Sequence, residues 1–291
     1  MKLWALALLL AAPLTSAAPF GNPSLGAKPY GILLLAYDVG GAWKTELSLL
    51  RSQLRGVAVE SVESAADPVA IQRALDRLRV QHVGKIAAVP LEIVSESSLM
   101  DEIRYLFGVR AEPAEDAPNR ANTGMPPLKS PAKRALILPP NTRSRRLKSS
   151  VPLVLGATMD KSPLLVQILA DRAQALARHP EKEAVVLVGL APRSDKALAA
   201  WKTPVTAIAE AVRVKGGFRE AGIIWVRDGV RAGQKDKDQE ENRAALRRLV
   251  TKGAVVAVPL APDGRRIGQL LRRQLGGGSY RWNGKGLIGD K

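Results

Sequence analysis

The sequence predicts an α/β protein built as a tandem duplication, in which each half holds a mostly parallel β-sheet flanked by helices. Strand-like and helix-like segments alternate along the 291 residues, and this alternation favours parallel strands joined by right-handed crossovers. In addition, segment 85–91, Lys-Ile-Ala-Ala-Val-Pro-Leu, recurs as segment 254–260, Ala-Val-Val-Ala-Val-Pro-Leu, at the same place in the order of segments. Such self-similarity is typical of repeated structural units.

The first predicted half spans 31–178, and its strands are short apolar runs at 31–35, 57–62, 85–91 and 151–155. Helices are expected at about 43–54, from 67, from 98, and at 163–178. The second of these should begin at Asp67-Pro68, because Asp caps free amides and Pro tolerates the first helical position. Between about 109 and 150 the composition shifts to Pro, Asn, Ser and basic residues, which predicts a flexible basic insertion with a short strand at 135–138.

The second predicted half spans 183–291 and repeats the plan. Strands are expected at 184–190, 223–227 and 254–260, and helices at about 196–214, 240–249 and 265–275. The polar stretch 228–239 is interpreted as a longer connection.

The first eighteen residues have the three regions of a secretory signal peptide. We therefore expect export to the periplasm or secretion after cleavage near residue 18. The alternative, a retained membrane anchor, is weaker because the apolar run of about ten residues falls short of the ~20 that a spanning helix needs. No later segment reads as transmembrane.

Composition excludes several classes of function. The chain has no cysteine, which rules out disulfides, thiolate metal sites and a cysteine nucleophile. Its net charge of +17 predicts attraction to nucleic acid, to acidic membrane surfaces, or to a small ligand with several carboxylates. Aromatic residues make up only 4% and no basic-aromatic cluster is visible, which argues against specific nucleic-acid binding. No nucleophile elbow or histidine-containing triad favours a hydrolase. The oligomeric state is not predicted.

Ordered motifs in the second half resemble the sirohydrochlorin chelatase-like family, the class II chelatases of cobalamin and sirohaem synthesis. The resemblance is carried by 185–189, by Pro192, Asp195 and Trp201, by 258–260 and by 280–287. In the first half, 89–91, the serine-rich turn 95–98 and the helical segment 101–108 agree in outline. The resemblance implies a tandem duplicated chelatase-like fold that holds an anionic tetrapyrrole between its halves and inserts Co²⁺ or Fe²⁺ as substrate metal.

Metal insertion needs a base for the pyrrole protons and a ligand that delivers the metal, and neutral histidine serves both purposes near pH 7. This chain departs from the family pattern at all four expected histidines. Where related proteins have His-Gly after the first strand of each half, it has Tyr37-Asp38 and Leu190-Ala191. Glu96 stands for the histidine of the serine turn, and Ser162 for the one before proline.

Only two histidines remain in the chain, and both are expected at the opposite end of the sheets from the ligand site. His82 precedes a predicted strand and His179 ends a predicted helix, where the helix dipole accounts for it. Two hypotheses follow. The chain is either a weakly active or inactive chelatase-like enzyme, or a non-catalytic envelope protein that binds a tetrapyrrole, a metal or a protein partner.

Candidate catalytic residues are Tyr37, Asp38 and Glu96, which stand at family positions beyond predicted strands. Glu92 and Glu96 lie four apart, so an extended backbone would put both on one face, where carboxylate oxygens could bind a divalent metal or act as a base if burial raised a pKa. Each residue also has a structural alternative to a functional role: Asp38 stabilises a turn through a hydrogen bond to its own backbone, and Glu96 is solvated in a turn.

Candidate substrate-binding residues are Ser95 and Ser97 of the serine turn, together with Arg193 and Arg265, which follow two predicted strands of the second half. Guanidinium groups fit anionic substituents such as carboxylates. The alternative for both arginines is a solvated cationic rim in a chain with 44 Lys and Arg.

Overall fold

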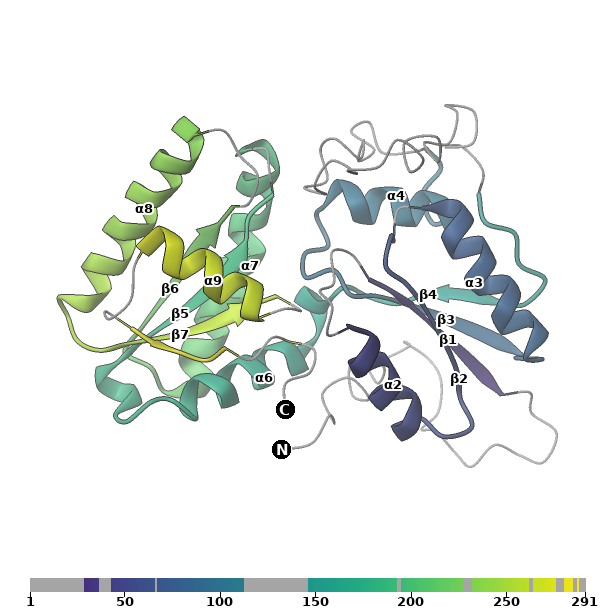
Figure 1. Ribbon diagram of the computed structural model, residues 1–291, viewed down its shortest axis with the longest axis horizontal. Helices are drawn as coiled ribbons and strands as arrows, with labels where there is room; N and C mark the ends of the chain where they lie inside the picture. The colour runs from purple at the N-terminus through teal and green to yellow at the C-terminus, as the bar shows by residue number, and fades with distance from the viewer. Residues whose placement is uncertain are drawn as a thin grey trace. The chain divides into compact units, whose positions relative to one another are not determined.

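The computed structural model describes residues 29–36, 43–65, 67–112, 146–192, 195–227, 232–261, 264–275, 280–284 and 287. The chain divides into two compact units, Met1–Met159 and Asp160–Lys291, and each is described here by itself (Figure 1). The predicted signal peptide 1–18 and the predicted short strand 135–138 lie outside the described residues. Within the described parts, none of the helices combines the length and apolar character needed to cross a membrane.

The first unit contains a four-stranded parallel sheet, called sheet 1, with strand order β2-β1-β3-β4. Its strands are β1 (Tyr30–Leu35), β2 (Ala58–Val62), β3 (Lys85–Pro90) and β4 (Leu153–Leu155). All four strands predicted for the first half are present. Residues 31–35 of the central strand β1 are all buried, as expected for a strand covered on both faces.

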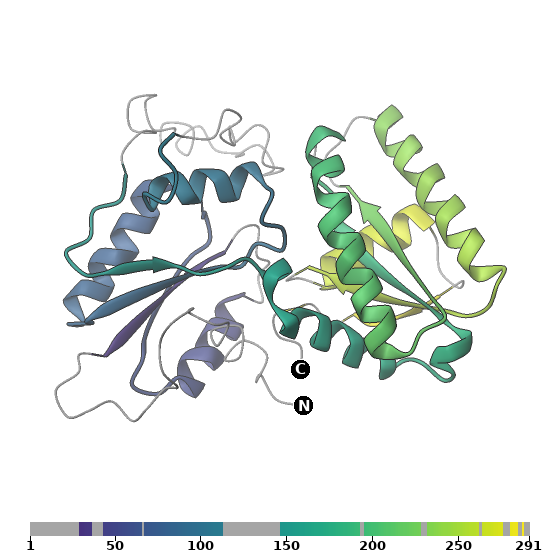
Figure 2. The same cartoon turned by 180° about the vertical axis from the view of Figure 1, so that it is seen from behind.

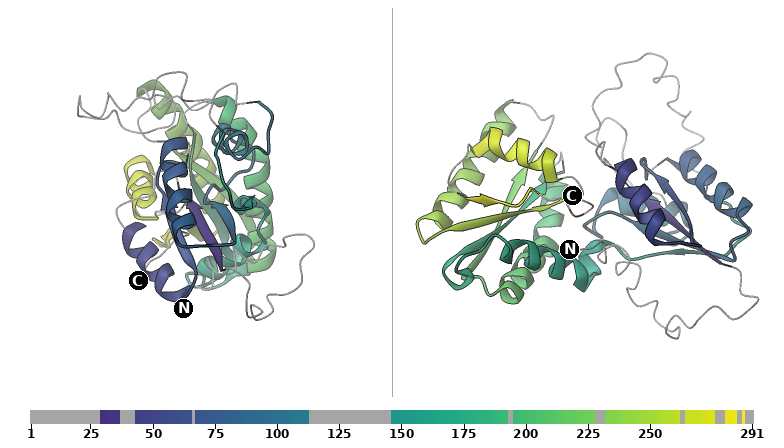
Figure 3. Two further views of the ribbon diagram at one scale, coloured as in Figure 1. Left: turned by 90° about the vertical axis from the view of Figure 1, so that its right-hand side faces the viewer. Right: turned by 60° about the horizontal axis from the view of Figure 1, so that its bottom comes forward.

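Helices cover both faces of sheet 1. Figures 1 and 3 show α2 (Trp43–Gln53) on one face, and α3 (Pro68–Val80) and α4 (Ser98–Leu106) on the other. The predicted start of α3 is confirmed, because Asp67 accepts hydrogen bonds from the N–H groups of Val69 at 2.9 Å and Ala70 at 3.2 Å. The core on this face joins side chains of β1 and β3 to those of α3 and α4.

The second unit contains sheet 2, also parallel, with strand order β6-β5-β7-β8. Its strands are β5 (Ala184–Leu190), β6 (Glu220–Val226), β7 (Val255–Leu260) and β8 (Arg281–Trp282). When β5 is matched with β1, the two sheets have the same strand order. Helices α6 (Pro163–Gln174) and α7 (Asp195–Gly216) cover one face, and α8 (Ala232–Val250) and α9 (Gly264–Leu275) cover the other (Figures 1 and 2).

Two features of the second unit correct the expectations from sequence. Helix α6 packs on α7 and β7, so it belongs to sheet 2 and not to the first half, where the range 31–178 puts it. Helix α8 begins at Ala232, so most of the predicted polar connection 228–239 is helical. Residues 232–239 lack apolar periodicity, and pairs such as Lys237 with Glu241, 4.0 Å apart, lie on the helix surface.

Candidate functional site

Each sheet has one place where a ligand site is expected. The strand order reverses between β1 and β3 in sheet 1 and between β5 and β7 in sheet 2, and open parallel sheets bind ligands beyond the carboxyl ends of the strands at such a point. We call this end of each sheet its carboxyl edge and the opposite end its amino edge. Glu92, Ser95, Glu96 and Ser97 follow β3, and Arg265 follows β7, so these predicted site residues come after the carboxyl ends of strands.

The register of the repeated Val-Pro-Leu strands relates the two edges to each other. Pro90 of β3 pairs with Leu35, and Pro259 of β7 pairs with Val188. Tyr37 and Leu190 each lie two residues beyond these partners. The pairing therefore supports the alignment in which Leu190 stands where Tyr37 stands in the first unit, although Tyr37 itself, with Asp38 and Arg193, lies outside the described residues.

The predicted carboxylate pair is not on a strand. Strand β3 ends at Pro90, whose partner Leu35 is the last residue of β1, and the N–H of Leu91 makes a final bond to the carbonyl of Leu35 at 2.9 Å. Glu92 and Glu96 therefore lie in the loop that follows, and the expectation that an extended strand presents both on one face is wrong. Glu96 is exposed, and Glu92 is partly buried.

The two serines of this loop have different environments. Ser97 Oγ accepts the N–H of Met100 at 3.1 Å, which makes Ser97 the N-cap of α4 and accounts for this residue without a ligand. Ser95 is buried, with 5% of its surface exposed. A substrate-binding role for either serine stays a prediction.

Histidine chemistry is missing from the carboxyl edges. His82 lies just before β3 and His179 just before β5, so both lie at amino edges, as predicted. Ser162, at a family histidine position, is 6% exposed at the start of α6. Among the described residues, no three His, Asp or Glu side chains come together to hold a metal ion. The described residues therefore provide no third ligand for the metal site predicted at Glu92 and Glu96.

A buried arginine at the carboxyl edge of sheet 2 is the feature that the sequence did not predict. Arg227 directly follows β6, and its side chain is only 2% exposed. Its Nη2 lies 2.5 Å from Oδ1 of Asp195, the first residue of α7, and its Nε lies 3.3 Å from Oδ2 of Asp238 on α8. Asp195 carries part of the family resemblance, but no local pattern pairs it with a residue 32 positions later.

Electrostatics at this pair are governed by the arginine. The hydrogen bond and the charge of Arg227 lower the pKa of Asp195, and the charges of Lys237 and Lys202 lower it further. Asp195 is therefore ionised over the whole physiological range of pH. Its side chain is 62% exposed, while that of Asp238 is 10% exposed, so one carboxylate faces water and the other is largely buried beside the guanidinium.

Two tryptophans pack beside the end of β5. The rings of Trp201 on α7 and Trp225 on β6 have centroids 6.3 Å apart with an interplanar angle of 54°. Gly189 makes room for Trp225, because a Cβ at residue 189 would lie 2.7 Å from Cζ3 of that ring. Within the described part of the chain, the buried Nε1 of Trp201 has no hydrogen-bond partner.

Cationic residues and helix starts also lie at the carboxyl edge of sheet 2. Lys196 is exposed in the first turn of α7, and Arg265 belongs to the first turn of α9. The N-terminus of a helix carries a partial positive charge and attracts anions. This edge is thus suited to bind a carboxylate-bearing ligand, while the described residues provide no histidine to act as base or metal ligand there.

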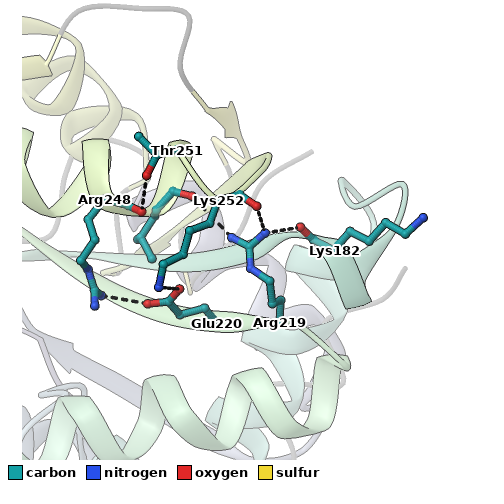
Figure 4. A network of polar contacts seen from close by, with 7 residues as sticks. Lys182, Arg219, Glu220, Arg248, Thr251 and Lys252 are labelled. Carbon is teal, nitrogen blue, oxygen red and sulfur yellow. Dashed lines mark hydrogen bonds and ion pairs between the residues drawn. The ribbon is translucent and has the colours of Figure 1, made fainter.

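The amino edge of sheet 2 holds a different network of charges (Figure 4). Arg219 donates to the carbonyl of Lys182 at 2.7 Å and to the carbonyl of Lys252. Glu220 pairs with Arg248 at 3.1 Å and with Lys252 at 3.2 Å. Cationic groups stabilise the carbonyl end of a helix. The network is therefore explained by its stabilisation of the C-terminal end of α8, and no ligand is needed to account for it.

The sequence matches no family model and none of the curated proteins compared with it. Solved structures with a similar fold include SirB from Bacillus subtilis with Fe³⁺, at 14% identity and a TM-score of 0.49, over 88% of this chain and 87% of that one. Another is DR2241 from Deinococcus radiodurans, a multi-domain protein similar to chelatases, at 16% identity and a TM-score of 0.48 over 89% of this chain. The chain spans 52% of the length of DR2241.

A periplasmic sugar-binding protein from Legionella pneumophila is also similar, at 10% identity and a TM-score of 0.34, over 84% of this chain and 74% of that one. Similarity of this extent does not identify the ligand of this chain, which has to be inferred from the chemistry of the site.

Proposed function

We propose that this protein binds an anionic tetrapyrrole of the sirohydrochlorin class at the carboxyl edge of sheet 2 and inserts Co²⁺ or Fe²⁺ weakly or not at all. The observation that carries the proposal is the composition of the carboxyl edge of sheet 2, where cationic residues and helix N-termini gather and histidine is missing. Such an edge favours the binding of carboxylates over proton abstraction and metal transfer.

The positive charge of the protein supports an anionic ligand. A net charge of +17 attracts polyanions, and a tetrapyrrole with several carboxylates pairs with guanidinium and ammonium groups. Lys196 and Arg265 are the residues of sheet 2 that we assign to this role, together with Arg193 from its sequence position. The proposal includes export, because the first eighteen residues resemble a signal peptide.

Weak insertion follows from the residues that replace histidine. Neutral histidine is the side chain that both takes protons and binds metal near pH 7, and the residue at one of these positions, Glu96, is exposed to water. Tyr37 and Asp38 remain candidates for residual activity, because their positions follow β1 directly.

Binding and insertion are tested separately on the protein that lacks residues 1–18. Sirohydrochlorin is titrated without metal under nitrogen, and its absorbance and the tryptophan fluorescence of the protein report binding. Co²⁺ or Fe²⁺ is then added, and the insertion rate is compared with the rate without protein. We expect saturable binding and a rate close to the protein-free rate. A protein that does not bind sirohydrochlorin contradicts the proposal, and rapid insertion contradicts its second part.

Two charge reversals locate the binding edge. Lys196 and Lys182 are both exposed, but Lys196 lies at the carboxyl edge of sheet 2 and Lys182 at its amino edge. Lys196→Glu is expected to weaken sirohydrochlorin binding about tenfold, while Lys182→Glu changes it much less, because exposed charges act over about a Debye length of 10 Å. Equal effects of the two substitutions would show attraction to net charge without a site at the carboxyl edge.

A further inference from the structure

Arg227 combines a buried guanidinium with one carboxylate partner that is open to water. Its side chain is 2% exposed, whereas that of Asp195 is 62% exposed. The second partner, Asp238, is 10% exposed and forms an ion pair with Nε at 3.3 Å. One carboxylate partner of the guanidinium is therefore buried, and Nη2 donates to a carboxylate at the surface.

The position of Asp195 allows its carboxylate to leave. Asp195 is the first residue of α7, so rotation about its side-chain bonds would move the carboxylate into water without a change in the helix. Lys202 and Lys237 are close enough to Asp195 to act on its charge, and they would attract any other carboxylate that approaches the same place.

We propose that Arg227 is a carboxylate-binding residue whose binding position is occupied by Asp195 in this structure. A carboxylate of the ligand competes with Asp195 for Nη2 and displaces it. The guanidinium suits this task because its fork of N–H donors matches the two oxygens of a carboxylate. This inference deepens the proposed function, on which it rests for the identity of the ligand, since it names a residue that receives one of the tetrapyrrole's carboxylates.

A purely structural ion pair predicts a different response to mutation. If Arg227 only ties β6 to α7 and α8, removal of Asp195 lowers stability and leaves the affinity for carboxylates unchanged. If Asp195 occupies a binding position, its removal raises that affinity, because a site that is free for a fraction of the time binds with its intrinsic affinity multiplied by that fraction.

Succinate is the probe, because it offers carboxylates without a tetrapyrrole, and calorimetry measures its affinity. The variant is Asp195→Ala, and the matched control is Glu181→Ala, which removes an equally exposed carboxylate (63%) at the amino edge. If Asp195 occupies Arg227 about nine-tenths of the time, Asp195→Ala binds succinate about tenfold more tightly than the wild type, and Glu181→Ala stays within about twofold. Adding Arg227→Lys to Asp195→Ala should abolish the gain, because lysine lacks the guanidinium fork.

The outcome is decided by the comparison of the two alanine variants. Asp195→Ala that binds succinate no better than Glu181→Ala overturns the inference, whether or not sirohydrochlorin binds. Thermal unfolding of each variant shows whether it is folded. Because the side chain of Asp195 is 62% exposed, we expect Asp195→Ala to fold. The proposed function is contradicted by a separate result, namely a wild-type protein that does not bind sirohydrochlorin. Even then, the succinate comparison still decides whether Arg227 binds carboxylates.

Discussion

The side-chain amide of Asn242 pairs with the backbone of Trp225, accepting its N–H at 3.2 Å and donating to its carbonyl at 2.7 Å. Trp225 lies on β6, an outer strand of sheet 2, so the asparagine takes the place of a neighbouring strand. Sheet 1 has a comparable arrangement, in which Arg51 donates twice to the carbonyl of Val59 on the outer strand β2, at 3.0 and 2.9 Å. Side chains thus cover part of each outer edge, which otherwise invites pairing with other chains.

Replacement of Asn242 by leucine is expected to destabilise the protein. Asn242 is buried, at 6% exposed, so the change leaves the N–H and carbonyl of Trp225 without their partner, which costs about 1–3 kcal/mol. Urea unfolding measures the loss. The control is Arg243→Ala on the exposed side of the same helix, which should change stability by less than about 0.5 kcal/mol. Equal stability of the two variants would show that the pairing with Trp225 contributes nothing.

Glu183 should make stability depend on pH. Burial alone would raise the pKa of Glu183, but the charged contact with Arg281 and hydrogen bonds from the backbone N–H groups of His179 and Arg178 bring it below its ordinary value of 4.5. A carboxyl group with a lowered pKa in the folded state contributes stability that is complete above 4.5 and is lost as the pH falls through the folded value.

The test compares wild type with Glu183→Gln in urea between about pH 7 and pH 3. At neutral pH we expect the variant to be less stable by about 3 kcal/mol, at the lower end for a broken buried pair, because the Arg281 side chain is 29% exposed. The difference should shrink below about pH 4.5, because only the wild type loses this stability on acidification. A difference that stays constant over this range would contradict the assignment to Glu183, and Glu240→Gln on the exposed surface serves as control.

Gly253 should tolerate no side chain. Its φ is +145°, and a Cβ there would lie 2.6 Å from Nη1 of Arg219 and 2.8 Å from the carbonyl oxygen of Lys182, within the network of Figure 4. Gly253→Ala is therefore expected to cost about 2–4 kcal/mol, from backbone strain and displacement of Arg219. Gly56→Ala is the control, since Gly56 has a φ of +80° but nothing within 4 Å, so only about 1 kcal/mol of strain applies. Thermal or urea unfolding of both variants measures their difference, which combines the contacts at residue 253 with the greater backbone strain at a φ of +145°.

Strands could be predicted from the sequence because burial on both faces leaves a local signature. The run 184–190 is apolar or glycine throughout, and the structure has β5 over the same residues. The start of α8 could not be predicted, because residues 232–239 are Ala and Gly followed by polar and charged residues and carry no apolar helical period. Likewise, α6 shows its apolar residues in sequence, but nothing local tells which sheet they will cover.

The candidate site was predictable only in its position. The alternation of segments and the Val-Pro-Leu repeat predicted which residues follow strands, since both are visible in short apolar segments. The strand order, which fixes where the order of strands reverses, came only from the structure. The pair of Arg227 and Asp195 was not predictable, because it depends on where β6 ends relative to α7, a long-range property of the fold. The expected face shared by Glu92 and Glu96 failed for a related reason, because β3 stops when its partner β1 ends at Leu35.

The two ends of the insertion meet on the surface of α4. Arg146 Nη2 donates to the carbonyl of Ala111 at 3.1 Å, and the N–H of Leu147 donates to the carbonyl of Leu106 at 3.0 Å. Lys148 pairs through its backbone with the side-chain amide of Gln72, at 2.9 Å in both directions. Residues 146–148 are therefore attached to the first unit. They do not belong to a flexible segment, so the predicted range of about 109–150 extends too far at its C-terminal end.

Deletion of 113–145 should leave the first unit folded. Because the residues on either side of the deletion are already held together, a linker of about four Gly and Ser residues can join them. We expect the free energy of unfolding to change by less than about 1 kcal/mol in urea. The matched control deletes 113–148 with the same linker, which also removes the bonds of Arg146, Leu147 and Lys148 and should destabilise by at least about 2 kcal/mol. If both deletions destabilise equally, the attachment at 146–148 does not contribute, and 113–145 itself supports the fold.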